Sequence, residues 1–290
     1  MHRNRFAVFG HPVAHSRSPF IHAAFAAQCG IDLEYTRVDA TPDDFVQALA
    51  DFAQDGGRGA NVTLPHKNAA AMLCATRSER AERAGAVNTL VRLDDVDGAA
   101  RWHGDNTDGV GLVRDLRDRH GVALEGACLL LIGAGGAAAG VAPALLDAGV
   151  ATLAITNRST DRLSALAERL ADHRVVASPW SMHASLDTDA TPDTRPIDIV
   201  INTTSAARSD ADVTWPFPAA LSNGWTAVDL GYGDTARAFL DAATQAGAAT
   251  CIDGLGMLVE QAAESFRLWH GVMPDTAPVY AALRHDRDRT

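Results

Sequence analysis

Residues 129–140 read LLLIGAGGAAAG, an apolar run that passes directly into a glycine-rich turn. Gly133, Gly135 and Ala138 have the G-x-G-x-x-A spacing, between a predicted strand and a predicted helix. In this context the first glycine permits a tight turn, the second lets the backbone approach a pyrophosphate, and the helix N-terminus supplies N–H groups. A tight turn in some other α/β protein is the alternative, but the flanking strand and helix favour a dinucleotide-binding site.

The next predicted strand, 151–157, ends in TNRSTDR, where an NAD-binding protein usually carries Asp or Glu for the ribose 2′-hydroxyl. Asn157, Arg158 and Ser159 occupy that place, and Arg162 follows one turn later. An arginine there can pair with a 2′-phosphate through two hydrogen bonds and stack beside the adenine. An ordinary solvated arginine is the alternative, and the position favours NADP as the cofactor.

Strand-like and helical patterns alternate along the chain, which is typical of a parallel α/β sheet. A chain of 290 residues is long enough for two domains. We expect a first α/β domain over 1–105, a second around the glycine-rich turn over 106–254, and C-terminal helices within 255–290 that return to the first. The predicted strands are 6–10, 33–38, 59–64, 127–133, 151–157, 197–202 and 226–230, the predicted helices are 19–29, 42–54, 107–119, 137–148, 160–171, 236–246, 255–270 and 276–285, and the predicted surface loops are 184–196 and 207–218.

The composition is that of an ordinary globular protein, with 47% hydrophobic residues and a net charge of −11. This charge argues against a nucleic-acid or anionic-membrane binder, and no apolar run is as long as a membrane span. The first residues lack the pattern of a signal peptide, and His11 and His15 have no further metal ligands beside them, so no metal is expected. Four scattered cysteines without a C-x-x-C pair indicate reduced thiols in a cytoplasmic protein: Cys29, Cys74, Cys128 and Cys251.

Lys67, in GANVTLPHKNAA (59–70), is the only lysine among the 25 lysines and arginines of the chain. Arginine stays protonated at any working pH, whereas a partly buried lysine can exchange a proton and act as a general acid or base. Chance is the simpler explanation, because most lysines are solvated surface charges. The count alone leaves both explanations open.

Two serines precede a predicted helix in HPVAHSRSPFIHAAF (11–25). Ser18 is followed by Pro19, which predicts a helix N-cap, so structure alone could explain Ser18. Ser16 has no such structural role. No arginine fork is found among the neighbouring motifs, so an anion at this place is expected to bind through neutral hydroxyls.

Further polar residues follow in three other motifs of the first domain. Asn61 and Thr63 share one face of a predicted strand, and Asn88 follows in GAVNTL. Asp108 begins a predicted helix, where an acid more commonly stabilises the helix dipole. Taken alone, each of these residues fits a turn or cap position about as well as it fits the role of a ligand. Together they suit a polyhydroxylated small molecule, which favours a chemical role for Lys67.

These residues match a family: the chain resembles shikimate dehydrogenases almost from end to end. Several distinct motifs in the same order are far more specific than one glycine-rich loop. The matching stretches are GHPVAHSRSPFIH, GANVTLPHK, AGAVNTL, GDNTDG, IGAGGAAAG, TNRSTDR and DGLGMLVEQAAESFRLWHG. The resemblance implies reversible NADP-linked reduction of 3-dehydroshikimate to shikimate in the pathway to chorismate and the aromatic amino acids, by a monomer or homodimer.

The resemblance also implies a role for individual residues. Lys67 and Asp108 would form the catalytic pair. The substrate carboxylate would be held by Ser16, Ser18 and Tyr232. The ring hydroxyls would be held by Asn61, Thr63, Asn88, Asp108 and Gln261. The NADP site would comprise Gly133, Ala134, Gly135, Gly136, Ala137, Asn157, Arg158, Ser159, Arg162, Thr203, Leu230 and Gly254, together with Glu79.

The chain departs from the family pattern where the nicotinamide and the substrate rim are expected. The family usually has Tyr-x-Pro-x-x-Thr-Pro after the last strand of the cofactor domain, and residues 232–238 read YGDTARA. The NTTS-x-Gly-Met pattern ends in Ala207 and Arg208, and Ala75 replaces a common acid. A quinate or aminoshikimate dehydrogenase and a non-catalytic NADP sensor are the alternatives. Retention of the Lys–Asp pair argues against the sensor.

Overall fold

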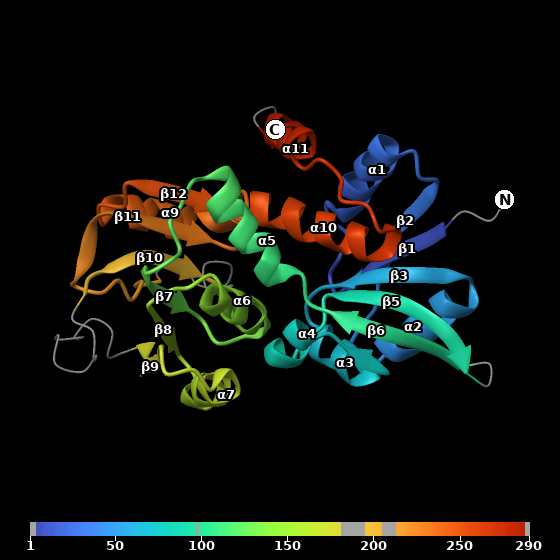
Figure 1. The fold of residues 1–290 in the computed structure, drawn as a ribbon, viewed down its shortest axis with the longest axis horizontal. Helices are drawn as coiled ribbons and strands as arrows, with labels where there is room; N and C mark the ends of the chain where they lie inside the picture. Colours follow the sequence, from blue (N-terminus) through green and yellow to red (C-terminus); the bar gives the residue numbers. More distant parts are fainter. Residues whose placement is uncertain (1–3, 97–98, 181–194, 205–212, 288–290) are drawn as a thin grey trace. The chain divides into compact units, whose positions relative to one another are not determined.

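The computed structural model describes residues 4–96, 99–180, 195–204 and 213–287 (Figure 1). The chain forms two compact units, Met1–Gly111 with Leu258–Thr290, and Leu112–Met257. Within the described ranges each unit has one six-stranded sheet. The predicted α/β class with two units is confirmed, and so is the return of the C-terminal helices to the first unit.

The first unit contains the elements before residue 108, parts of two helices that the division cuts, and the last helix of the chain. These are β1 (Asn4–Gly10), α1 (Ser18–Cys29), β2 (Leu33–Asp39), α2 (Phe45–Gln54), β3 (Gly57–Val62), α3 (Lys67–Leu73), β4 (Thr76–Arg77), α4 (Glu79–Ala84), β5 (Thr89–Val96), β6 (Ala99–Asp105), the start of α5 (Asp108–Arg114), most of α10 (Leu255–His270) and α11 (Ala277–Arg287).

The division after β6 falls inside α5, at Gly111, whereas the sequence pattern suggests residue 105. Asp108 at the start of α5 accepts a hydrogen bond from Asn88 of the first unit. A Cβ on Gly111 would lie 2.7 Å from Gln261 of α10, so the first turn of α5 packs closely within this unit. The predicted helix 107–119 continues after α5 as a π-helical turn, η1 (Asp115–Arg119).

The sheet of the first unit has the order β2-β1-β3-β5-β6-β4 and is mixed, whereas the sequence pattern predicts a parallel sheet. β1 is parallel to β2 and β3, but β5 is antiparallel to β3 and β6. Asp97-Gly98 separates β5 from β6 in the sequence, and an Asp-Gly pair between two apolar runs is a hairpin signal. Because antiparallel strands joined by a hairpin need no helical crossover, the alternation of strands with helices did not predict this antiparallel pairing.

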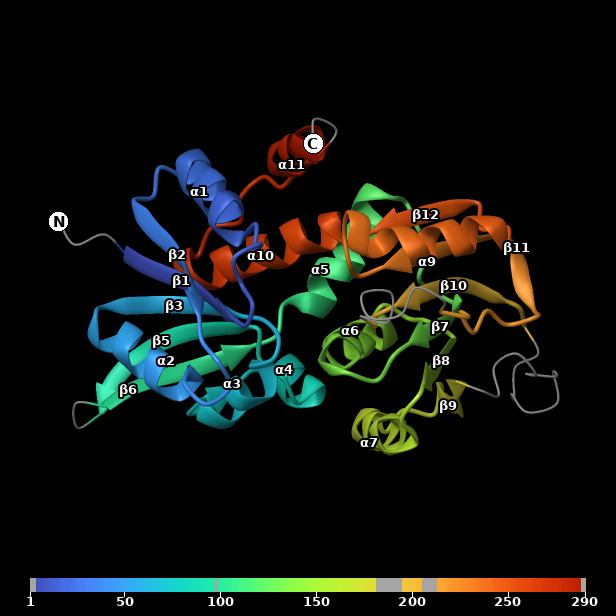
Figure 2. The same ribbon diagram turned by 180° about the vertical axis from the view of Figure 1, so that it is seen from behind.

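Helices cover both faces of this sheet, with α2 on one face and α1 and α10 on the other (Figure 2). Phe45 and Phe52 of α2 pack against Phe9 of β1, with ring centroids 5.9 and 5.5 Å apart. On the opposite face, Phe6 of β1 lies 4.7 Å from the ring of Trp269 in α10. Burial of large rings on both faces stabilises the sheet and leaves the ends of its strands for polar residues.

The sheet of the second unit is parallel throughout, in the order β9-β8-β7-β10-β11-β12. This is the 3-2-1-4-5-6 order of a Rossmann fold, in which ligands bind where the order reverses, here between β7 and β10. The predicted Rossmann-type unit is confirmed. Its described elements are β7 (Cys128–Ile132), α6 (Gly136–Asp147), β8 (Thr152–Asn157), α7 (Thr160–Leu170), β9 (Val175–Pro179), β10 (Ile197–Asn202), β11 (Leu221–Asp229), α9 (Asp234–Gln245) and β12 (Thr250–Asp253). Residues 184–194 and 207–212 of the two predicted loops, with Ala207 and Arg208, lie outside the described residues.

Candidate active site

Lys67 and Asp108 form an ion pair in the first unit. They are the first residues of α3 and α5, and Lys67 Nζ lies 2.5 Å from Asp108 Oδ2. Asp108 Oδ1 accepts a hydrogen bond of 2.7 Å from Asn88 Nδ2. The side chains of the pair are 15% and 8% exposed, so water reaches them only in part. Among the residues that the structure describes, Asp108 is the only hydrogen-bond acceptor for this ammonium, which keeps N–H groups for a ligand.

Asn88 connects the ion pair with α10. Its Oδ1 accepts a hydrogen bond of 2.9 Å from the Thr107 N–H, and its Nδ2 lies 3.4 Å from Gln261 Oε1. Asn88 and Gln261 are both buried, at 2% and 9% exposure. Three of the residues expected at the ring hydroxyls, Asn88, Asp108 and Gln261, therefore lie together beside Lys67.

A half-buried arginine between two buried carboxylates supports the loop that carries Asp108. Arg80 of α4 donates to both carboxylate oxygens of Asp105, at 2.6 and 2.9 Å, and reaches Glu264 of α10 at 3.1 Å. Burial raises the pKa of Asp105, but the hydrogen bonds and the charge of Arg80 outweigh burial and hold this pKa below its usual range. The cluster joins α4, the end of β6 and α10. The sequence motifs did not single it out, because its members are far apart in the chain.

Ser16 and Ser18 lie at the start of α1, with their hydroxyl oxygens 3.2 Å apart. The predicted N-cap role of Ser18 is wrong, because Arg17 occupies the N-cap and α1 begins at Ser18 without a side-chain cap. The Ser18 hydroxyl is instead hydrogen-bonded to Ser16 and Tyr35. Arg37 donates two hydrogen bonds, of 3.0 and 2.6 Å, to the main-chain oxygen of Ser16. A guanidinium that no motif indicated therefore holds this turn.

Asn61 and Thr63 lie at the end of β3 in different surroundings. Asn61 is 6% exposed, and both sides of its amide are hydrogen-bonded to other side chains. Thr63 is half-buried, and its methyl group packs beside Gly10, where a Cβ would lie only 2.5 Å away. Within the described ranges no group hydrogen-bonds to the Thr63 hydroxyl, so Thr63 is the better placed of the two to bind a ligand.

The glycine-rich turn after β7 has the shape that a bound phosphate needs. Gly133 has a φ of +118°, which favours glycine, and a Cβ there would lie 2.3 Å from Thr203 Oγ1. Gly135 and Gly136 border open space, since a Cβ on either would meet no atom within 4 Å. Gly135 is the N-cap of α6, and no side chain caps this helix. Its first N–H groups are therefore available to an anion.

The residues after β8 are those expected to select the cofactor. Asn157 accepts a hydrogen bond of 3.3 Å from the glycine-rich turn and donates one of 2.9 Å to the main-chain oxygen of Ser159. Ser159 caps α7 by accepting a hydrogen bond from the N–H of Arg162. Arg158 is exposed, and its guanidinium lies 5.1 Å from the ring centroid of Trp180. Asn157 and Ser159 thus shape the loop, while Arg158 is stacked at its surface.

The remaining predicted residues belong to different units, with Thr203, Leu230, Tyr232 and Gly254 in the second and Glu79 in the first. A Cβ on Gly254 would lie 2.2 Å from the main-chain oxygen of Leu230, so the site excludes any side chain there. Glu79 is exposed in the first turn of α4. Tyr232, expected at the substrate carboxylate, is not in the unit that contains the two serines.

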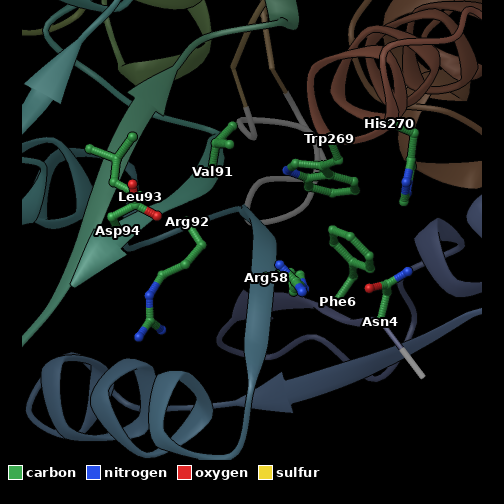
Figure 3. A pocket seen from close by; sticks show the side chains of 9 residues that line it. All are labelled: Asn4, Phe6, Arg58, Val91, Arg92, Leu93, Asp94, Trp269 and His270. Atoms are coloured by element: carbon green, nitrogen blue, oxygen red, sulfur yellow. The ribbon is translucent and has the colours of Figure 1, made fainter. Parts of the chain in front are cut away.

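A cavity of about 290 Å³ lies elsewhere in the first unit (Figure 3). Its lining residues are Asn4, Phe6, Arg58, Val91, Arg92, Leu93, Asp94, Trp269 and His270. None of the residues expected to bind substrate or cofactor lines it. This cavity is therefore separate from the candidate active site.

The comparison with known proteins identifies the family. Residues 8–90 match the shikimate dehydrogenase substrate binding domain, residues 116–209 match shikimate/quinate 5-dehydrogenase, and residues 254–284 match the shikimate 5′-dehydrogenase C-terminal domain. The chain is 54% identical over 282 residues to a shikimate dehydrogenase (NADP(+)) of Xanthomonas oryzae pv. oryzae, covering 97% of this chain and 95% of the relative. The chain belongs to the shikimate dehydrogenase family. The resemblance seen in the motifs is confirmed.

Solved structures of related proteins have the same fold. An Ael1 enzyme from Pseudomonas putida is 39% identical, with a TM-score of 0.85 over 97% of this chain and 98% of its own. A shikimate 5-dehydrogenase from Thermus thermophilus, in complex with NADP(H) and shikimate, is 34% identical, with a TM-score of 0.79 over 97% and 99%. In the part of this family member that the structure describes, no helix is both long and apolar enough to cross a membrane.

Proposed function

We propose that this protein is an NADP-dependent shikimate dehydrogenase, an oxidoreductase that interconverts 3-dehydroshikimate and shikimate on the pathway to chorismate and the aromatic amino acids. The observation that carries the proposal is the Lys67–Asp108 pair, in a chain 54% identical to a shikimate dehydrogenase (NADP(+)). The Thermus thermophilus relative, solved with NADP(H) and shikimate, supports the choice of both ligands.

In the proposed reaction Lys67 moves the proton. NADPH, when bound, supplies the hydride that reduces the ketone. The Lys67 ammonium donates a proton to the ketone oxygen during reduction and takes it back from the hydroxyl in the reverse direction. Asp108 directs the ammonium, and Asn88 keeps the carboxylate from rotating by its hydrogen bond to Oδ1.

The first unit would bind the substrate. Ser16 and Ser18, with Tyr232 of the second unit, would hold the carboxylate, and Arg37 adds positive charge at the serine turn. The ring hydroxyls would form hydrogen bonds with the partly exposed Thr63 hydroxyl. They would also bond to three buried polar side chains beside the Lys67 ammonium, which are Asn88, Asp108 and Gln261. Such a site favours a substrate with several hydroxyl groups, because each buried polar group needs a partner.

The second unit has residues that fit NADP. The open backbone at Gly135 and Gly136 leaves room for a pyrophosphate at the N-terminus of α6. Arg158 and Arg162 follow β8 and are both exposed, and Asn157, Arg158 and Ser159 occupy the place where an NAD-binding protein usually carries an acid. Thr203, Leu230 and Gly254 would line the rest of the cofactor site, with Glu79 as a contact from the first unit.

We also propose that the enzyme works in the cytoplasm as a monomer or homodimer. All four cysteines carry free thiols, as is usual for proteins of a reducing compartment. The oligomeric state can be measured by light scattering at several protein concentrations.

Steady-state rates with shikimate and with quinate, each with NADP and with NAD, test the proposed function. NADPH formation is followed by absorbance. We expect the highest kcat/KM with shikimate and NADP. A higher kcat/KM with quinate would indicate a quinate dehydrogenase, and no turnover of either substrate would indicate a protein that only binds the cofactor.

A further inference from the structure

The arginine expected at the 2′-phosphate of NADP lies beside a tryptophan that no motif indicated. β8 and β9 are parallel neighbours, with Asn157 paired to Pro179 where both strands end. Arg158 and Trp180 are the residues that follow this pair. The guanidinium carbon of Arg158 lies over the Trp180 ring, 5.1 Å from its centroid. An indole face attracts a cation at such a distance, so the two side chains form a cation–π pair at the carboxyl ends of the strands, where a Rossmann-type unit binds its ligand.

Trp180 is held in place by aromatic residues of the same unit. Its ring centroid lies 6.2 Å from that of Trp215, which is 9% exposed. The Trp215 ring in turn lies 4.9 Å from that of Phe239, at an interplanar angle of 77°. Phe239 is fully buried in α9. Trp180 therefore rests on the core of the second unit and gives the exposed Arg158 side chain a partner of fixed position.

The pairing with Trp180 is compatible with the binding of a phosphate by the same arginine. The attraction between an aromatic face and a cation acts on the charge of the guanidinium and needs no hydrogen bond. A 2′-phosphate binds arginine instead through two N–H groups that lie in the plane of the guanidinium. The two interactions are of different kinds and can occur together.

The pairing should also lower the cost of binding the phosphate. An exposed arginine loses rotamer freedom when a ligand fixes it, and this loss weakens binding. A side chain that already lies over Trp180 has lost part of this freedom before the cofactor arrives. NAD has no 2′-phosphate, so the benefit falls mainly on NADP.

We infer that Trp180 is a positioning residue for the cofactor, whose ring holds the Arg158 guanidinium ready for the 2′-phosphate of NADP. Trp180 thus contributes to the preference for NADP over NAD through Arg158. The inference rests on the proposed function, in which Arg158 binds this phosphate.

Calorimetric titration of NADP and of NAD into the wild type, Trp180→Leu and Trp180→Phe tests the inference, with turnover measured separately. Leucine keeps an apolar side chain against Trp215 but has no ring, whereas phenylalanine keeps a ring for the guanidinium. We expect Trp180→Leu to raise the Kd of NADP roughly three- to tenfold and that of NAD by less than about twofold. Trp180→Phe should recover most of the affinity for NADP.

Tyr280→Leu is the matched control. The guanidinium carbon of Arg284 lies 5.2 Å from the centroid of the Tyr280 ring, so this variant removes a cation–π pair of similar distance. The control pair belongs to α11 of the first unit, whereas Arg158 and Trp180 belong to the second. Tyr280→Leu should leave the Kd values of NADP and NAD unchanged.

A double variant tests whether Trp180 acts through Arg158. In an Arg158→Ala background, Trp180→Leu should weaken NADP binding little further. Equal weakening of NADP and NAD binding, equal weakening with and without the Arg158 side chain, no recovery in Trp180→Phe, or unchanged NADP binding in Trp180→Leu would each overturn the inference. A wild-type protein that prefers NADP to NAD in binding but does not oxidise shikimate contradicts only the proposed function, whereas one that binds both cofactors equally contradicts both.

Discussion

Lys67 Nζ lies 2.5 Å from one oxygen of Asp108, while Asn88 holds the other oxygen at 2.7 Å. A carboxylate held at both oxygens cannot turn its charge away from the ammonium. Arginine pairs with carboxylates at least as well as lysine does, so an ion pair alone does not account for lysine in a chain whose other cations are all arginine. The exchange of a proton does account for it.

Lys67→Arg should keep the charge and substrate binding but remove most of the turnover. We expect the KM for shikimate to stay within a few-fold and kcat to fall by roughly 10²–10⁴, the usual contribution of a general acid or base. Steady-state rates at saturating NADP measure both quantities. Turnover at the wild-type rate would show that this position needs only a positive charge.

Amine acylation should inactivate the enzyme at one site. Lys67 is the only lysine, so the reagent can modify only its side chain and the amino terminus. We expect bound shikimate to protect both the activity and the peptide that contains residues 59–70, because the substrate covers the ammonium. Mass spectrometry of this peptide, with activity followed in parallel, measures the protection. Full activity after complete modification of Lys67 would contradict the proposed role.

Arg158→Asp should change the cofactor preference. The substitution replaces a guanidinium that would pair with the 2′-phosphate by a group that repels it. We expect the ratio of kcat/KM for NADP to that for NAD to fall by roughly tenfold or more. Arg169→Asp makes the same change of charge at an exposed position of the last turn of α7 and should leave the ratio unchanged. If both variants have the same ratio of kcat/KM for NADP to that for NAD, Arg158 is an ordinary surface charge.

Ser16→Ala should weaken substrate binding. The variant keeps the hydrogen bonds from Arg37 to the main-chain oxygen of Ser16 and loses the hydroxyl, with its hydrogen bonds to the Ser18 N–H and hydroxyl. We expect KM for shikimate to rise by an amount that corresponds to roughly 1–2 kcal/mol, as for a hydrogen bond to a charged group. KM at saturating NADP is the measurement, and an unchanged value would exclude the Ser16 hydroxyl from the substrate site.

His22 should make the protein less stable in acid. Burial lowers its pKa to about 3 in the folded protein, against 6.5 for the ordinary side chain. Between these values the unfolded chain binds more protons, so the free energy of unfolding falls as the pH falls from 6.5 toward 3, and His22 has no such effect above 6.5.

At pH 5 this effect should lower the free energy of unfolding by about 2 kcal/mol relative to pH 7. Urea unfolding of the wild type and His22→Gln at both pH values measures it. We expect the difference between the two pH values to be about 2 kcal/mol smaller in the variant. An equal difference in both proteins would mean that His22 does not titrate on unfolding.

The second unit could be predicted from the sequence because its signals are local. The glycine-rich turn, the strand before it and the helix after it are adjacent in the chain, and Gly133 is required by its own φ of +118°. The alternation of strands and helices also predicts a parallel sheet, because two neighbouring parallel strands must be joined by a crossover, which is usually a helix.

The interior of the first unit could not be predicted in the same way. The partners of Asn61 come from α1, β2 and α10, and Ser265 is 204 residues away in the chain. A tyrosine on β2 and a histidine on α1 have no local pattern that distinguishes buried hydrogen-bonding residues from surface ones. The Ser18–Pro19 pair even predicts the wrong role, because a tertiary hydrogen bond to Tyr35 engages the hydroxyl that a helix cap would use.

The discontinuity of the first unit has a consequence for synthesis on the ribosome. Residues 258–290 complete this unit but are translated after the whole of the second unit. Until α10 emerges, Arg80 lacks Glu264 and Asn61 lacks Ser265, so each side chain lacks one of the hydrogen bonds that it makes in the finished protein. The contiguous second unit has no such delay and can fold on the nascent chain. The newborn polypeptide therefore holds a Rossmann-type unit before Arg80 and Asn61 can form their hydrogen bonds with α10.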